Sequence, residues 1–216
     1  MILETLSPLG EPLGNPKNIT GLDWSDLNIN ESNHLGCVRC TIAVGFNEIS
    51  PTLSQQLHIN LPSKPGRVVV ANGRHLIWLS PRSWLILFSL NKVELDNSCL
   101  NEYSLNESSL NESSLDKEKK LLESINAAFP DRSVLASAYS DYLCWFSLNG
   151  DKAKTVLHQG GFISLAPEGI PVGHAKRTLI AGIPAVIYRT SITEWNLGIE
   201  RSHASYLQTW FRSLRV

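Results

Sequence analysis

The sequence predicts an α+β domain built from two β-α-β-β-β-α units, each with an antiparallel sheet. Three observations point to this class. Short runs rich in β-branched and aromatic residues outnumber the helical segments. Tight-turn signals at Asn72-Gly73 and at Gly182 join neighbouring runs as hairpins. The order of strands, helices and turns in residues 36–129 recurs in residues 134–214, as expected for a duplicated architecture.

Composition limits the function. The chain has 216 residues, enough for a substantial core. Its 19 basic and 20 acidic residues nearly cancel, and no basic stripe suggests a nucleic-acid surface. Apolar runs are far shorter than the ~20 residues that span a bilayer, and the N-terminus lacks a basic signal-peptide region. We therefore expect no nucleic acid, no membrane and a cytoplasmic location.

The chain divides into three parts. Residues 1–33, rich in Asn, Pro and Ser, are expected to form an extended arm over the body or over a partner. Residues 34–130 and 131–216 form the two α+β halves of one compact domain. The first half carries a low-complexity insert at 98–115. Its LNESS repeat has a period of five, which builds no continuous apolar stripe on a helix or a strand, so we expect a surface insertion.

In the first half, the pattern predicts strands and helices in the following order: a strand at 36–46, a helix at 51–59, a hairpin at 67–79, a strand at 84–90 and a helix at 116–129. Ser50 is the expected cap of the first helix, with Pro51 at its first position. Asn72-Gly73 is the strongest short hairpin signal in the chain.

The second half should repeat this order, with strands at 142–148, 174–180, 185–190 and 195–199. Asp151 is the expected cap of a short helix that Gly160-Gly161 ends in the left-handed conformation. The turn between the second and third strands is expected at 181–184. A terminal helix from about Ser202, its cap, carries one apolar face: Leu207, Trp210, Phe211 and Leu214.

The four cysteines fit a reducing compartment. Cys37 and Cys40 have the C-x-x-C spacing, but a lone pair supplies only half of a structural zinc site. Three residues apart on a strand, their sulfurs point to opposite faces. We expect reduced, structural cysteines and no metal site, and assign no chemistry to Cys99 and Cys144.

A search for catalytic motifs finds no dinucleotide fingerprint, phosphate loop, metalloprotease motif or nucleophile elbow. His174, Arg177 and Thr178 form the densest polar cluster. His174 is a candidate for proton transfer or for a hydrogen-bonded structural role. Arg177 and Arg201 are candidates to bind a carboxylate of a ligand or partner, the alternative being ordinary salt bridges. Some of the six tryptophans are candidate interface anchors.

Several short sequence segments, taken in their order along the chain, resemble the gamma subunit of heterotetrameric sarcosine oxidase. They are LSPRSWLIL at 79–87, Ser-Asp at 140–141, LNG at 148–150, GHAKRT at 173–178, LIAGIP at 179–184, Trp195, and Arg-Ser at 201–202. The resemblance covers residues 66–90 and 134–214. It marks the following residues as family-motif or partner-contact candidates: Trp84, Ser140, Asp141, His174, Arg177, Thr178, Gly182, Trp195, Arg201, Ser202 and Trp210.

The resemblance implies a fold similar to the folate-binding domain of glycine-cleavage T protein. It also implies a complex with alpha, beta and delta subunits that oxidatively demethylates sarcosine to glycine and reduces oxygen to peroxide. FAD, FMN, NAD and tetrahydrofolate would lie on the alpha and beta subunits and zinc on the delta subunit, leaving this chain with no cofactor and no reacting group of its own. His174→Ala or Arg177→Ala should then weaken assembly rather than turnover.

Two alternatives stay open. One is a free-standing folate-binding or aminomethyl-transfer protein of the T-protein type. Those enzymes are longer than this chain, and Ala138 stands where their pattern has an acidic residue. The other is a structural domain that serves an unrelated partner.

Overall fold

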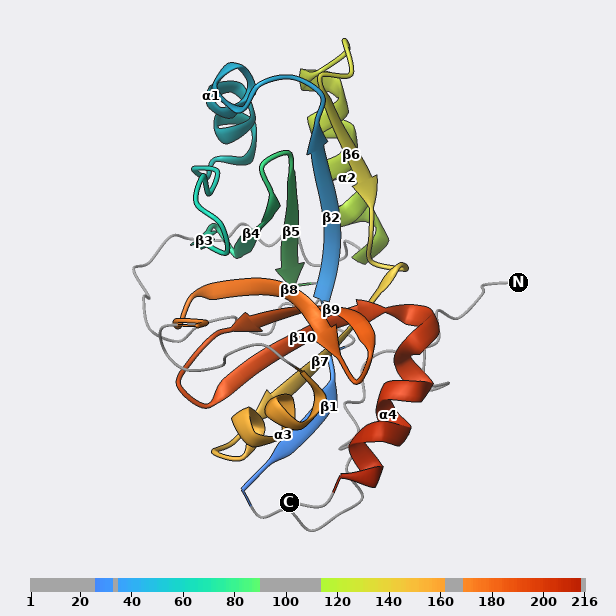
Figure 1. The fold of residues 1–216 in the computed structure, drawn as a ribbon. Coiled ribbons are helices and arrows are strands. Elements are labelled where there is room, and N and C mark those ends of the chain that lie inside the picture. Colours follow the sequence, from blue (N-terminus) through green and yellow to red (C-terminus); the bar gives the residue numbers. More distant parts are fainter. Residues whose placement is uncertain (1–25, 33–34, 90–113, 162–168, 215–216) are drawn as a thin grey trace, which may run out of the picture.

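A computed structural model describes residues 26–32, 35–89, 114–161 and 169–214 (Figure 1). These residues form two five-stranded antiparallel sheets, with strand orders β3-β4-β5-β2-β6 and β1-β7-β10-β9-β8. The α+β class with antiparallel sheets is therefore confirmed. Most of the expected arm, most of the insert at 98–115, and Cys99 lie outside the described residues.

Both halves show the predicted β-α-β-β-β-α order. The first contains β2 (Leu35–Ile42), α1 (Phe46–Leu57), β3 (Val68–Ala71), β4 (Arg74–Ser80), β5 (Ser83–Ser89) and α2 (Ser114–Ala128). The second contains β7 (Leu143–Asn149), α3 (Ala153–Gly160), β8 (His174–Ile180), β9 (Ile183–Arg189), β10 (Glu194–Glu200), the 3₁₀ turn η2 (Arg201–His203) and α4 (Ala204–Ser213).

Two further strands cross between the halves. β1 (Asn28–Glu31), from the region expected as an extended arm, pairs with β7 in the second sheet. β6 (Val134–Ala138), grouped by sequence with the second half, pairs with β2 in the first sheet. Each sheet thus gains one edge strand from outside its own β-α-β-β-β-α unit, which ties the halves together.

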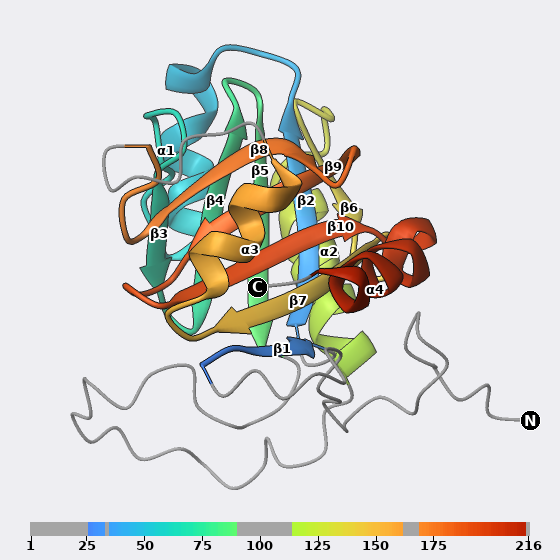
Figure 2. The ribbon, with the colours of Figure 1, turned by 60° about the horizontal axis from the view of Figure 1, so that its bottom comes forward.

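The elements form four layers, with the two sheets inside and the helices outside. α1 and α2 cover the outer face of the first sheet, and α3 and α4 that of the second (Figure 2). The strands of one sheet run across those of the other (Figure 1). Between the sheets lies a third apolar cluster, which includes Cys37, Ile77, Trp145 and Tyr188.

The aromatic run of β7 shows why a strand can be apolar at consecutive positions. Cys144, Phe146 and Leu148 face α3 and α4, whereas Trp145 faces the first sheet. Because alternate side chains point to opposite faces, a strand with cores on both sides needs apolar residues at consecutive positions.

Both hairpins turn through two residues with left-handed backbone. Asn72 and Gly73 have φ of 53° and 67°, and Ala181 and Gly182 have φ of 51° and 82°, as in type I′ turns. The four-residue turn expected at 181–184 is therefore wrong, because β9 begins at Ile183. Pro184 is tolerated within β9 because the pairing of β10 with β9 ends at Ala185. On the β10 side, therefore, no strand needs a hydrogen bond from the backbone nitrogen of Pro184.

The predicted helix caps are wrong. α1 begins at Phe46 rather than Pro51, which lies inside the helix, and Ser50 caps nothing. Here the burial of Ile49, Leu53 and Leu57 outweighs the hydrogen bond that Pro51 cannot donate.

α3 and α4 also begin without a side-chain cap. Lys152 precedes α3 in place of Asp151, and α4 continues directly from η2. Ser202 Oγ instead donates a hydrogen bond to Glu200 Oε1 at 3.0 Å.

Gly160 and Gly161 do not form the expected left-handed helix end, since Gly161 is extended at φ −140°. Their role is close packing. A Cβ atom on Gly160 would lie 2.7 Å from the Trp210 ring, and one on Gly161 would lie 2.9 Å from Ile180 Cδ1.

Candidate functional site

Two of the candidate residues are core tryptophans. Trp84 is 1% exposed, and its indole N–H donates a hydrogen bond to the Pro62 carbonyl at 3.0 Å. Trp195 is also 1% exposed, with the Arg189 guanidinium 4.9 Å from its ring centroid. Neither is available as an interface anchor on this chain.

Two more candidates serve the packing of the second half. Gly182 supplies the left-handed position of the β8–β9 turn. Trp210 is half-buried against Gly160 and the ring of Phe211, whose centroid lies 5.2 Å away. Trp210 is therefore only partly a core residue.

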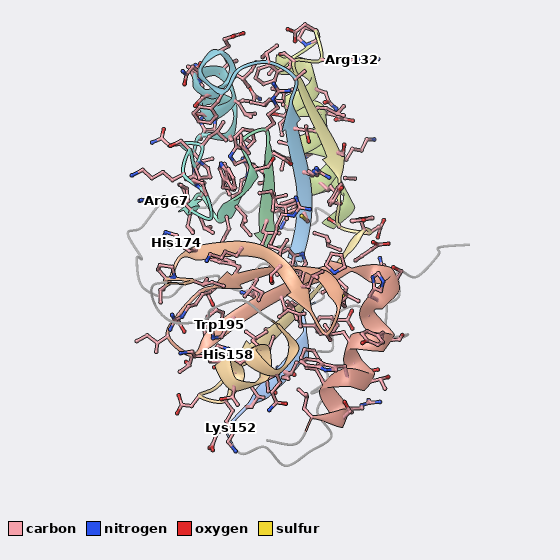
Figure 3. All side chains as sticks on the ribbon, viewed as in Figure 1. Arg67, Arg132, Lys152, His158, His174 and Trp195 are labelled. Atoms are coloured by element: carbon pink, nitrogen blue, oxygen red, sulfur yellow. The ribbon has the colours of Figure 1, made fainter. Side chains whose placement is uncertain are left out.

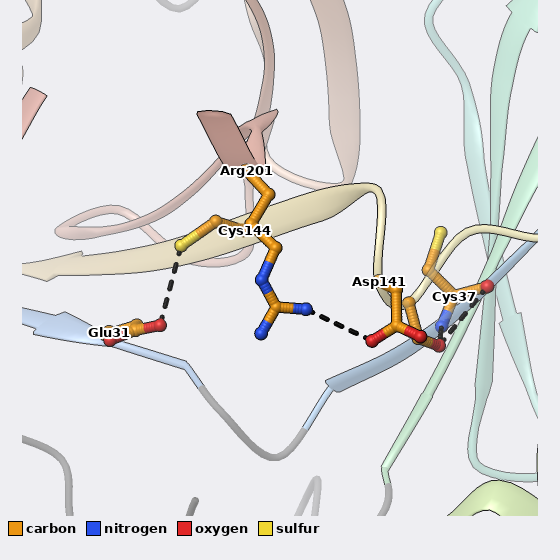
Figure 4. A network of polar contacts seen from close by, with 6 residues as sticks. Glu31, Cys37, Asp141, Cys144 and Arg201 are labelled. Atoms are coloured by element: carbon orange, nitrogen blue, oxygen red, sulfur yellow. Dashed lines mark hydrogen bonds and ion pairs between the residues drawn. The ribbon is translucent and has the colours of Figure 1, made fainter. Parts of the chain in front are cut away.

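Asp141 and Arg201 meet near Cys37 of β2 (Figure 4), and Ser140 directly precedes Asp141 in the chain. Ser140 Oγ accepts a hydrogen bond from Cys37 N at 2.8 Å and donates to Cys37 O at 3.4 Å, which fixes the β6–β7 turn to β2. Arg201 Nη1 donates to Asp141 Oδ1 at 3.1 Å, and Arg201 N donates to Tyr142 O at 2.9 Å. For Arg201, the ordinary salt bridge is therefore present.

Beside this junction the inner faces of the sheets diverge and leave a groove of about 440 Å³, here called the inter-sheet groove. Both sheets contribute to its wall. Its lining residues are Arg39, Leu79, Leu85, Tyr139, Tyr142, Leu143, Arg177, Thr178, Leu179, Pro184, Ala185, Val186, Gly198, Ile199 and Glu200.

One wall of the groove is held by three side-chain hydrogen bonds. Arg39 donates from Nε to Ser83 Oγ at 3.0 Å and from Nη1 to the Tyr139 hydroxyl at 2.7 Å. The Tyr142 hydroxyl donates to Glu200 Oε2 at 3.1 Å, and this hydrogen bond raises the pKa of Tyr142. The rings of the two tyrosines lie 4.9 Å apart. These contacts fix the orientation of the guanidinium and of both phenols.

The opposite wall presents Arg177, Thr178 and Leu179 from β8. Arg177 is exposed and makes no hydrogen bond or ion pair with any residue that the structure describes. Leu179 is 49% exposed and Tyr142 is 48% exposed. The groove thus combines an available guanidinium with exposed apolar surface. These are the two kinds of surface that a protein partner or a ligand binds.

His174 does not join Arg177 in the groove. It lies where the sheets are held together, with its backbone bridged to Arg67 (Figure 3). Its Nδ1 is 3.2 Å from the Val172 carbonyl. This is the hydrogen-bonded structural alternative. Alternation along the strand already predicts that Arg177 points away from the face of His174, whereas Thr178, expected on that face, lines the groove with Arg177.

The sequence did not single out Arg39, Tyr139 or Glu200. A signal was available for Arg39, because it is a charged residue inside the apolar strand CVRC. Arg39, Glu200 and Arg177 line the same groove because of how the two sheets cross. Local sequence patterns do not encode that crossing.

The cysteines that the structure describes are buried free thiols on different faces. Cys37 lies between the sheets, and Cys40 faces the α1–α2 side, as the spacing predicted. Burial raises the pKa of Cys40 to about 12 and raises the pKa values of Cys37 and Cys144 as well. Buried neutral thiols are poor nucleophiles and poor ligands.

Within the described ranges, no three His, Cys, Asp or Glu side chains come together as metal ligands. The helices in the same ranges are all too short or too polar to cross a membrane.

A four-layer fold with two antiparallel sheets places the chain in a structural class that contains sarcosine oxidase and aminomethyltransferase chains. Neither a protein-family model nor a curated protein sequence matches the chain. The similarity is therefore one of three-dimensional structure.

Two solved structures represent this class. One is a chain of the heterotetrameric sarcosine oxidase from Corynebacterium sp. U-96 in complex with pyrrole 2-carboxylate, with a TM-score of 0.67 and 19% identity over 88% of this chain and 87% of that one. The other is the glycine cleavage system aminomethyltransferase T from Bartonella henselae, with a TM-score of 0.55 and 10% identity over 87% of this chain. The match covers 46% of that transferase. The fold implied by the resemblance is confirmed.

Proposed function

We propose that this chain is a non-catalytic assembly subunit of the gamma type in a cytoplasmic sarcosine oxidase complex. Its partners would be the alpha, beta and delta subunits. FAD, FMN, NAD, tetrahydrofolate and zinc would be held by those subunits, and the complex would demethylate sarcosine oxidatively to glycine.

The observation that carries the proposal is the extent of the structural match. It covers 88% of this chain and 87% of a chain from a heterotetrameric oxidase, so the two chains correspond over nearly their whole lengths. The match to the transferase covers less than half of that enzyme. A chain that corresponds to a whole subunit of a complex is better suited to assembly than to the complete reaction of a longer enzyme.

Most of the marked residues hold the chain's own fold together. Ser140, Asp141 and Arg201 join the sheets, and Trp84 and Trp195 fill the cores. Arg177 differs from them, because it is exposed in a groove with apolar walls and has no partner among the described residues. We therefore assign the inter-sheet groove as the candidate contact with a partner subunit.

Co-purification tests the proposal. The tagged chain, expressed in its own cells, should retain a large protein with flavin absorbance that oxidises sarcosine. A chain that is recovered repeatedly without a flavoprotein would contradict the assembly role.

The similarity to aminomethyltransferase T leaves a folate-binding role as the competing hypothesis. Calorimetry of the isolated chain with tetrahydrofolate separates the two. Saturable micromolar binding would favour the folate-binding protein, whereas the assembly role predicts no binding by the chain alone.

A further inference from the structure

A second cavity, of about 600 Å³, lies between the end of α1, the β3–β4 hairpin and α2. It shares no lining residue with the inter-sheet groove. Four basic residues line it: His58, Arg74, Lys117 and Lys120. No Asp or Glu of the described residues lines it. We call it the basic pocket.

The charge of Arg74 is only partly compensated. It is half-buried, and among the described residues its one hydrogen bond runs from Nη1 to the Leu57 carbonyl at 3.3 Å. Burial lowers the pKa of Arg74, as expected for a charge that has lost part of its hydration. A partly buried guanidinium with most donors unused is an energetic cost that a bound anion would remove.

The other basic side chains come from two further parts of the fold. His58 follows α1 and its imidazole has no partner among the described residues, while Lys117 and Lys120 project from α2 and keep contacts of their own. A tetrahedral phosphate offers terminal oxygens in several directions, whereas a carboxylate offers two oxygens in one plane. Cations arranged around a cavity therefore suit a phosphate better than a carboxylate.

The pocket also has apolar lining and a fixed frame. Phe88 and Leu121, which line it, are 7% and 6% exposed. Gln56 on α1 donates a side-chain hydrogen bond to Ser124 on α2, which holds the two helices together at the pocket. A volume of about 600 Å³ exceeds what a free phosphate ion needs and lies within the range of small-molecule sites.

We propose that the basic pocket binds the phosphate group of a small phosphomonoester whose organic part rests against Phe88 and Leu121. The site is independent of the proposed assembly function, because it lies on the helical face of the first half, and either proposal can fail without the other.

Calorimetry of the full chain with phenyl phosphate, inorganic phosphate and benzoate tests the ligand class. We expect saturable binding of phenyl phosphate with a Kd below about 1 mM. Inorganic phosphate should bind more weakly because it lacks the apolar group, and benzoate should bind most weakly. No saturation with phenyl phosphate, or equal or tighter binding of benzoate, would overturn the proposal.

Two charge reversals one residue apart locate the site. Lys120 lines the pocket, whereas Lys119 is exposed and lies 3.9 Å from Glu123 on the helix surface. Lys120→Glu should weaken phenyl phosphate binding by at least about tenfold, as expected for the loss of a charged contact and its replacement by a repulsive one. Lys119→Glu, with the same change in net charge, should weaken it by less than about threefold. Equal losses would show that only diffuse charge attracts the anion.

Arg74→Gln completes the test, with an expected loss of affinity of at least about tenfold in a protein that still folds. Normal binding by a folded Arg74→Gln protein would contradict the site. If this variant does not fold, the comparison of Lys119→Glu with Lys120→Glu still tests where the anion binds.

Discussion

The close packing of Gly160 against Trp210 leaves no room for a Cβ atom at position 160. A Cβ on Gly160 would lie 2.7 Å from the Trp210 ring. Gly160→Ala should therefore destabilise the protein by about 1–3 kcal/mol through overpacking. In a Trp210→Ala background the same change should cost less, because the contact with the indole is gone and only Ile180 Cγ2, at 3.0 Å, still crowds the new Cβ. Urea unfolding of the four proteins measures this coupling, and identical effects in both backgrounds would contradict it.

The buried thiols predict a pH dependence of stability. Burial raises the folded-state pKa of Cys40 to about 12, whereas an unfolded thiol ionises at about 8.5. The unfolded chain therefore loses protons first as pH rises, and stability falls between about pH 8.5 and pH 12. Each such thiol contributes about 1.4 kcal/mol per pH unit in this window.

Cys40→Val tests this account. Between pH 9 and 10, the slope of the unfolding free energy with pH should become less steep by about 1.4 kcal/mol per pH unit. An unchanged slope would show that Cys40 is not the buried neutral thiol described here.

At the residue scale, sequence patterns predicted side-chain direction better than side-chain contacts. Alternation along a strand placed Cys37 and Cys40 on opposite faces, as found. The ion pair of Asp141 with Arg201 joins residues far apart in the chain, so a pattern of neighbouring residues could not predict it. The caps predicted at Ser50 and Ser202 failed because the apolar faces of their helices fix the helix starts.

At the element scale, the two hairpins differ in one instructive residue. Asn72 and Ala181 hold the same turn position, with φ of 53° and 51°. Asn tolerates left-handed backbone better than Ala does. Ala181→Asn should therefore stabilise the protein by about 0.5–1 kcal/mol, and Asn72→Ala should cost at least as much because it also removes the hydrogen bond to the His58 carbonyl. Thermal unfolding measures both changes, and a lower Tm for Ala181→Asn would contradict the turn assignment.

At the scale of the whole molecule, the crossing strands decide how the halves depend on each other. Ile29 on β1 is fully buried in the core of the second half. Ile29→Ala should cost about 2–5 kcal/mol, whereas Ile29→Val should cost about 0.5–1.5 kcal/mol. Chemical denaturation followed by Trp fluorescence gives both values. If Ile29→Ala were as stable as the wild type, β1 would be a loosely attached arm after all.

The duplication could be predicted from sequence because each unit is local and its hairpin turns are marked. The exchange of β1 and β6 could not, because each pairs with a strand outside its own unit. The inter-sheet groove follows from how the crossing sheets diverge, so its residues become visible only in three dimensions.

The central claim is that the chain contributes a surface rather than a reactive group. Arg177 and Lys176 are exposed neighbours on β8 whose side chains point to opposite faces, with Arg177 in the inter-sheet groove. The most direct measurement compares Arg177→Ala with Lys176→Ala for affinity to the proposed flavoprotein partners and for sarcosine turnover per assembled complex. We predict weaker assembly for Arg177→Ala alone and unchanged turnover per complex for both. Full assembly with collapsed turnover for Arg177→Ala would contradict the account.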